Sequence, residues 1–134
     1  ACSPASNAIV RDTDTIRGIL DNFESHHNHT FAVAGADGRL TGVITLEHLK
    51  ETLLIGEMAE NMLAMDIMDR PEHTCSPDTS LPAVYEQFSE CDTEALPIVD
   101  ADGRPLGMIE KFAVDHYLHT RIIELQRRLT AMGS

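Results

Sequence analysis

The sequence has few basic residues and no long apolar run. Ten lysines and arginines stand against 22 acidic residues, a net charge of −12 at pH 7, and no basic stripe occurs along the chain. Because nucleic-acid phosphates and anionic membrane surfaces both attract clustered Lys and Arg, we expect neither as a partner. The longest apolar stretch, around 31–34, is far shorter than the roughly 20 residues that span a bilayer. We therefore expect no direct membrane insertion of this chain.

Cysteines and catalytic motifs are also scarce. Cys2, Cys75 and Cys91 are odd in number and have no C-x-x-C spacing, which argues against a disulfide framework and favours a reducing, cytoplasmic compartment. Neither a Gly-x-Ser-x-Gly elbow nor a P-loop is present, so we expect no enzyme. His26, His27 and His29 could hold a metal, but no acid or thiol lies close enough in sequence to complete the shell. We expect no metal site.

What the sequence does contain is one segment written twice. Residues 36–44 (ADGRLTGVI) return as 101–109 (ADGRPLGMI), at an offset of 65 residues with no gap. Asp-Gly between apolar runs predicts a β-hairpin in each copy, because Gly takes the positive φ of the tight turn. Apolar residues outside the hairpins match at the same offset. The pairs include Ile16 with Leu81, Ile19 with Val84, Phe23 with Phe88, and Leu49 with Val114. Two copies of one supersecondary unit therefore make up most of the chain.

Each unit is predicted to run strand, helix, strand, strand, helix. The first has a strand at 9–10, helices at 15–25 and 45–54, and a hairpin of 31–34 with 40–44. The second has a helix at 81–91, a hairpin of 96–99 with 105–109, and a closing helix from 111. We assign 1–8 to a linker or added residues, 9–60 and 61–120 to the two repeats, and 121–134 to a helical extension and tail. A repeat of about 60 residues is marginal alone, so we expect a shared core.

The closing helix carries a near-heptad seam. Its apolar residues step by four, four, three, four and three: Val114, Leu118, Ile122, Leu125, Leu129 and Met132. Such a seam needs a partner surface. The two alternatives are that it packs on its own module or that it pairs across a dimer.

Several short motifs carry a family resemblance. Asp-Ile-Met-x-x-Pro at 66–71, Ser-Pro-Asp-Thr-Ser-Leu at 76–81, Leu-Pro-Ile-Val-Asp at 96–100 and Gly-Met-Ile at 107–109 occur in that order. Together they resemble a cystathionine-β-synthase (CBS) domain, and Gly-Val-Ile-Thr-Leu-Glu at 42–47 closes the first copy in the same way. The resemblance covers about 9–120. It implies an α/β (α+β) fold of two β-α-β-β-α CBS repeats related by pseudo-two-fold symmetry, plus a long C-terminal helix, acting as a regulatory module.

The resemblance also implies ligand clefts between the repeats for AMP, ADP or ATP. The family pattern after the hairpin is Gly-hydrophobic-x-Thr/Ser-x-x-Asp, in which the hydroxyl and the carboxylate hold the ribose. The first repeat has Thr45 and His48 at these two positions, and the second has Glu110 and Ala113, so neither keeps the carboxylate. The implied first cleft comprises Thr45, His48, Thr74, Thr93 and Ala95, beside His73 and a phosphate-repelling Glu94. The implied second cleft comprises Ile9, His29, Thr30 and Glu110.

The closing helix suggests a host protein. His116-Tyr117 and the arginine-rich continuation are similar to the cytosolic tails of prokaryotic chloride channels and chloride/proton exchangers. That similarity implies a homodimer through the CBS repeats, attached to the transmembrane part of a transporter and held in the cytoplasm at the inner membrane. Two alternatives stay open. One is a structural dimerisation platform that binds no small molecule, and the other is a stand-alone or enzyme-linked CBS sensor.

Overall fold

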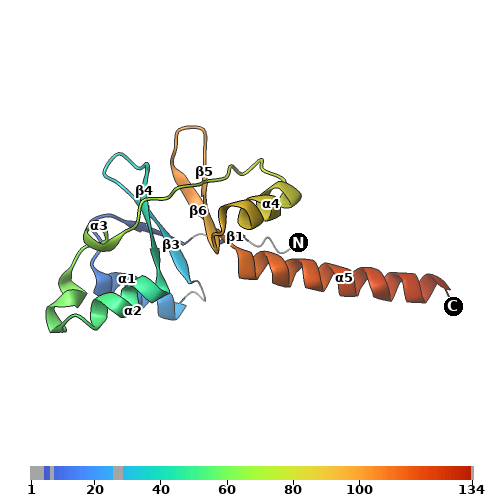
Figure 1. The fold of residues 1–134 in the computed structure, drawn as a ribbon, viewed down its shortest axis with the longest axis horizontal. Helices are drawn as coiled ribbons and strands as arrows, with labels where there is room; N and C mark the ends of the chain where they lie inside the picture. Colours follow the sequence, from blue (N-terminus) through green and yellow to red (C-terminus); the bar gives the residue numbers. More distant parts are fainter. Residues whose placement is uncertain (1–4, 7, 26–28, 134) are drawn as a thin grey trace.

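The computed structural model describes residues 5–6, 8–25 and 29–133, and it contains two three-stranded sheets with helices packed against them (Figure 1). The first sheet has the order β2-β3-β4, with β2 (Ile9–Arg11) parallel to β3 (Thr30–Ala34) and β3 antiparallel to β4 (Leu40–Thr45). The second has the order β1-β6-β5 and is antiparallel, from β1 (Ala5–Ser6), β6 (Pro105–Glu110) and β5 (Ala95–Val99). The predicted α/β class is confirmed.

The helices begin where the sequence supplies caps. Thr15 Oγ1 accepts from the Gly18 N–H at 3.1 Å, Thr45 Oγ1 from the His48 N–H at 3.1 Å, and Ser80 Oγ from the Ala83 N–H at 3.4 Å. Each satisfies an N–H that has no partner within its helix. The predicted helices are confirmed to within about a residue at each end. They are α1 (Ile16–Ser25), α2 (Leu46–Leu53), α4 (Leu81–Cys91) and α5 (Lys111–Gly133); a 3₁₀ turn η1 (Glu57–Asn61) and α3 (Ala64–Ile67) join the repeats.

The internal repeat is visible in the strand register. Val10 pairs in parallel with Val33, and Cys75 forms a parallel bridge with Ile98, which are the same two positions 65 residues later. The hairpins share an irregularity after Val33 and after Ile98, and their turn glycines both have positive φ, 81° at Gly38 and 83° at Gly103. The predicted duplication is confirmed. The first strand of the second repeat is reduced to the single bridge at Cys75.

The segment before each repeat pairs with the sheet of the other repeat. Strand β1 pairs with β6, which gives residues 5–6, predicted as part of a linker, a place in the second sheet. Asp69 pairs with Val43 of β4 through two backbone hydrogen bonds of 2.8 and 2.9 Å. A Cβ at Gly42 would lie 2.8 Å from the Met68 Cβ, so the connecting chain sits directly on β4. These crossed pairings tie the two repeats together.

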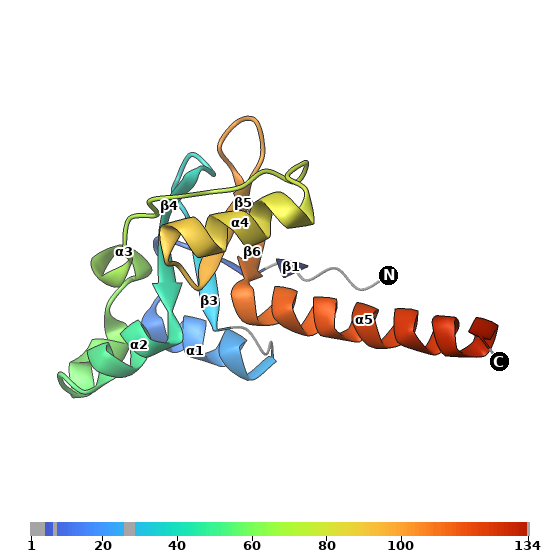
Figure 2. The same cartoon turned by 45° about the vertical axis from the view of Figure 1, so that its right-hand side comes forward.

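The cores of the two repeats are joined through β6. The larger core surrounds the first sheet and includes Phe31, Ile44 and Leu49, but it also takes in Met108 from the second repeat. A smaller core lies under α4 and includes Phe88, Leu96 and Val114. Strands β3 and β6 lie against each other where the two sheets meet (Figure 2). The expectation of a shared core holds at Met108.

Helix α5 leaves the body of the molecule after its first two turns. Val114 is buried and Leu118 is partly buried on the smaller core. The remaining seam residues are exposed, from 45% at Leu125 to 84% at Met132, and Figures 1 and 2 both show the helix projecting away. The alternative that the whole seam packs on its own module is therefore wrong beyond Leu118. In the part of the chain that the structure describes, no helix has the length and apolarity to cross a membrane.

Candidate functional site

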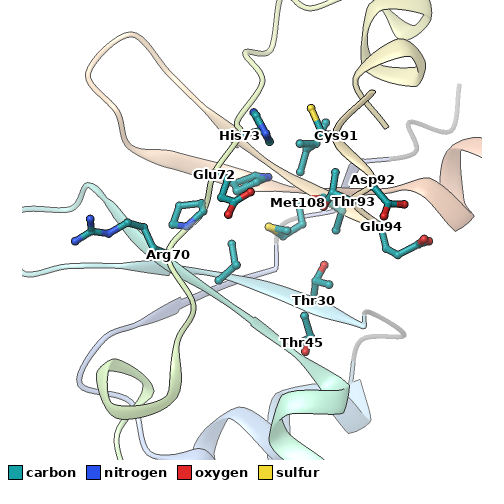
Figure 3. A pocket seen from close by; sticks show the side chains of 15 residues that line it. Thr30, Thr45, Arg70, Glu72, His73, Cys91, Asp92, Thr93, Glu94 and Met108 are labelled. Carbon is teal, nitrogen blue, oxygen red and sulfur yellow. Dashed lines mark hydrogen bonds between the residues drawn. The ribbon is translucent and has the colours of Figure 1, made fainter. Parts of the chain in front are cut away.

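A cavity of about 380 Å³ lies between the two repeats (Figure 3). This volume falls within the range of sites for small molecules, about 300–1,000 Å³. Three segments line it: strand ends of the first repeat, the end of α4 with β5 and β6 of the second, and the connecting chain. The lining residues are Thr30, Val43, Thr45, Arg70, Pro71, Glu72, His73, Cys91, Asp92, Thr93, Glu94, Ala95, Leu96, Pro97 and Met108.

The inner walls of the cavity are apolar. Val43 comes from β4, Leu96 and Pro97 from β5, and Met108 from β6. Two threonine hydroxyls add polar groups. Thr45 Oγ1 caps α2 and keeps its own proton to donate, while Thr93 Oγ1 donates to the Ala95 carbonyl at 3.0 Å and keeps lone pairs to accept. Apolar walls with a few polar groups suit a flat heterocycle that carries hydroxyls.

Charge at the cavity is mostly negative. Glu72, Asp92 and Glu94 line it, against Arg70 and His73, and Figure 3 shows the carboxylates of Asp92 and Glu94 on the same side. A polyphosphate bound here would lie near three carboxylates, and unscreened like charges repel. The arrangement favours a ligand with little negative charge.

The structure brings together some of the residues predicted for the first cleft. Thr45, Thr93 and Ala95 all line the cavity, together with Thr30, which the sequence assigned to the second cleft. His48 and Thr74 do not line it. His48 Nδ1 is buried 3.4 Å from Asp69 Oδ2 and has no hydrogen-bond partner among the described residues. The Thr74 carbonyl accepts from Gln87 Nε2 at 3.3 Å, because the neighbouring Cys75 pairs with β5 and turns Thr74 towards α4.

The connecting chain and the apolar walls were missed by sequence reasoning. Arg70, Pro71 and Glu72 reach the cavity because Asp69 pairs with Val43, a contact between distant positions that no local pattern announces. Val43 and Met108 occupy matching positions in the two hairpins. Their shared offset was the available signal that both would face the inter-repeat space.

Glu110 fills the position in the second cleft that corresponds to Thr45. Its carboxylate accepts from the His29 N–H at 3.2 and 3.3 Å and from the Thr30 hydroxyl at 3.2 Å. The His29 ring lies edge-on to Phe112, with ring centroids 6.3 Å apart. Of the residues predicted here, His29, Thr30 and Glu110 meet in one cluster, while Ile9 on β2 is 38% exposed. The carboxylate thus joins the two repeats where the resemblance implied a ligand hydroxyl contact. His26 and His27 lie outside the described residues.

Replacing Glu110 with alanine should destabilise the fold. The change leaves the His29 N–H and the Thr30 hydroxyl without their acceptor at a site where the carboxylate is only 13% exposed. We expect a loss of about 1–3 kcal/mol in the free energy of unfolding, measured by urea denaturation. Glu86→Ala, on the exposed face of α4, is the control and should change stability by less than about 0.5 kcal/mol. Equal effects of the two substitutions would contradict the assigned role of Glu110.

The thiols of Cys75 and Cys91 should differ in reactivity. Burial raises the pKa of the Cys75 thiol above its usual value, which lowers its thiolate fraction at any given pH, while Cys91 is half-buried at the cavity. In a Cys2→Ser variant at pH 8, we expect iodoacetamide to modify Cys91 and to leave Cys75 intact, as read by peptide mass spectrometry. Unfolding in urea should equalise the two rates. Faster labelling of Cys75 in the folded protein would contradict this placement.

Comparison with known proteins agrees with this geometry. Residues 64–119 match the family model described as the CBS domain. The chain folds as a CBS domain pair. Protein MJ1004 from Methanocaldococcus jannaschii has a TM-score of 0.74 to it at 18% identity, over 96% of this chain and 65% of that one. No curated protein sequence matches the chain significantly.

Two further solved structures with this fold contain adenosine compounds. The CBS domain pair of protein MJ0100, solved with 5′-methylthioadenosine and S-adenosyl-L-methionine, has a TM-score of 0.72 at 17% identity, over 87% of this chain and 90% of that one. The cytosolic domain of the Mg²⁺ channel MgtE, solved with ATP, has a TM-score of 0.66 at 22% identity, over 84% of this chain and 46% of that one. CBS pairs are regulatory modules rather than catalytic ones, and these likenesses establish the fold of this CBS pair.

Proposed function

We propose that this CBS pair is a regulatory module that binds one adenosine-type ligand per chain, in the cleft between its repeats. The carrying observation is the 380 Å³ cavity with its apolar walls and its two hydroxyls, Thr45 and Thr93. The second cleft has no comparable role, because the Glu110 carboxylate is already engaged with His29 and Thr30.

The charge at the cavity selects among adenosine compounds. AMP, ADP and ATP are the ligands that the family resemblance implies, and the related MgtE domain was solved with ATP. Glu72, Asp92 and Glu94 oppose phosphate groups here, with Arg70 and His73 as the basic side chains among the lining residues. We therefore favour 5′-methylthioadenosine or S-adenosylmethionine, with which the MJ0100 pair was solved, followed by AMP and then by ATP.

The module acts within a larger protein in this proposal. A membrane transport protein is the proposed host, with a chloride channel or exchanger suggested by the similarity at His116-Tyr117 and the arginines that follow. The fold shared with the MgtE cytosolic domain supports a transporter, though not a particular ion. Two copies form a homodimer through the repeats in the cytoplasm at the inner membrane. Ligand binding then biases the host by its different affinity for two states of the module. Transmembrane helices encoded in the same reading frame are the direct test of the host.

A dimerisation platform without a ligand is the second candidate. Neither repeat keeps the ribose carboxylate, with His48 and Ala113 at those positions, and Glu110 fills one cleft with a side chain of the protein itself. A rigid pair with both clefts silent would serve assembly rather than sensing.

Thermal unfolding with a ligand panel separates the two candidates. S-adenosylmethionine at about 100 times its dissociation constant should stabilise the chain by about 2.7 kcal/mol, and ATP at equal concentration by less. Thr45→Ser keeps both the cap and the hydroxyl and should keep the ligand increment, whereas Thr45→Ala should reduce it. Because Thr45→Ala also removes the α2 cap, the compared quantity is the increment and not the midpoint itself. No shift with any adenosine compound would favour the platform, and a larger shift with ATP would overturn the charge argument.

A further inference from the structure

The free half of α5 combines apolar and basic side chains. Ile122, Leu125, Leu129 and Met132 are 54%, 45%, 69% and 84% exposed, and no described element covers them. Residues 121–133 carry three arginines and one acid, although the chain as a whole has a net charge of −12. Arg121 pairs with Glu124 at 3.0 Å, which leaves Arg127 and Arg128 without an ion-pair partner in the described part of the chain.

A second uncovered patch lies at the end of α2, and its charge is opposite. Leu54 and Ile55 are 86% and 82% exposed, among the most exposed large apolar side chains of the described residues. Glu47 and Glu51 are exposed on the same helix, and Glu60 lies on η1, which packs beside α2. Lys50 is the basic residue of α2 and pairs with Glu47. The patch is therefore apolar at its centre and acidic at its edge.

The two patches cannot meet within one chain. Figures 1 and 2 place α2 at one end of the molecule and the tip of α5 at the other, with α5 pointing away from the body. The occupant that supplies both complementary surfaces is a second copy of this chain. Two α5 helices packed together would instead bring arginines from both copies to one contact, with Glu124 as the one acid of that segment and already paired.

We propose that the free half of α5 (121–133) docks on the α2 patch (Glu47, Glu51, Leu54, Ile55 and Glu60) of a second copy, reciprocally. In an antiparallel, side-by-side pair each α5 lies over the partner's α2, which makes the contact two-fold and closed. Thirteen helical residues span about 20 Å, enough to cross the eight residues of α2, about 12 Å. Apolar burial supplies affinity, and Arg127 and Arg128 facing glutamates set the orientation.

Interchain crosslinking tests the docking directly. In a Cys2→Ser, Cys91→Ser background, one pool carries Leu54→Cys and a second pool carries Leu129→Cys. On mixing and mild oxidation, we expect a disulfide-linked pair of one copy from each pool, and none within either pool alone. Dimers from the Leu129→Cys pool alone would mean α5 on α5, and dimers from the Leu54→Cys pool alone would mean α2 on α2. Either result overturns the proposal, as does a monomeric mass with no crosslink.

Charge exchange provides a matched second test. Arg127→Glu with Arg128→Glu should weaken dimerisation at least tenfold by sedimentation equilibrium, and adding Glu47→Arg and Glu51→Arg to the same chain should restore it. All four residues are exposed, so far-ultraviolet circular dichroism should stay unchanged and serve as the folding control. Loss without restoration would overturn the proposed pairing of α5 with α2. An unchanged dimer in the first double variant would overturn it as well.

Discussion

Replacing Ala95 with tryptophan is expected to abolish stabilisation by adenosine compounds. Ala95 stands on β5 at the mouth of the inter-repeat cavity, where Thr45 and Thr93 also lie. A tryptophan side chain there would occupy the space that we assign to the ligand. A ligand that adds about 2.7 kcal/mol at 100 times its dissociation constant should then add almost nothing, which corresponds to a loss of affinity of at least about 100-fold.

Two further measurements keep this result interpretable. Ala95→Trp without ligand should unfold cooperatively, which shows that the variant still folds. Ala101→Trp places the same side chain on the exposed turn of the second hairpin, 65 residues after Ala36, and should keep the full ligand increment. A ligand increment that survives Ala95→Trp would place the binding site elsewhere on the molecule.

Replacing Phe31 with alanine is expected to cost the most stability of any substitution considered. The side chain is 2% exposed on β3, inside the larger core. A buried Phe→Ala change costs about 3–5 kcal/mol, a large part of the 5–15 kcal/mol that holds a domain folded. Because Met108 of the second repeat belongs to the same core, we expect both repeats to lose stability together, in one transition rather than two.

The matched control for Phe31 is Phe112→Ala. Phe112 is 71% exposed at the start of α5, so the same chemical change there should cost less than about 1 kcal/mol. Urea denaturation followed by circular dichroism and by intrinsic fluorescence of Tyr85 and Tyr117, both in the second repeat, checks the result. Two separate transitions would contradict a shared core, and equal costs at the two positions would contradict the burial assignment.

The fold was predictable because its signals are local and occur twice. The Asp-Gly turns at 37–38 and 102–103, the caps Thr45 and Ser80, and the apolar periodicity of α1 and α4 each predict an element without reference to the rest of the chain. The common offset then predicts that the elements form two similar units. The pairing of β1 with β6 and the reduction of a strand to one bridge at Cys75 were not predictable, because both depend on contacts between segments far apart in sequence.

The site was predictable only in part, for the same physical reason. Thr45 and Thr93 were found because a hydroxyl near a hairpin end follows from the family pattern. His48 was carried along by its position three residues after Thr45, yet the α2 helix turns its ring towards Asp69. The engagement of Glu110 with His29 and Thr30 spans about 80 residues, and no spacing rule gives its direction. The acidic edge of the cavity depends on where the connecting chain crosses β4.

The measurement that tests the account most directly is a calorimetric titration of the chain with S-adenosylmethionine, alongside ATP and the Ala95→Trp variant. We expect saturable binding with one ligand per chain, tighter than for ATP, and no heat of binding in Ala95→Trp. One site per chain follows from Glu110 being engaged in the second cleft. Two ligands per chain, tighter binding of ATP, or equal binding by Ala95→Trp would contradict the proposed site, and absence of binding by all adenosine compounds would leave the dimerisation platform as the function.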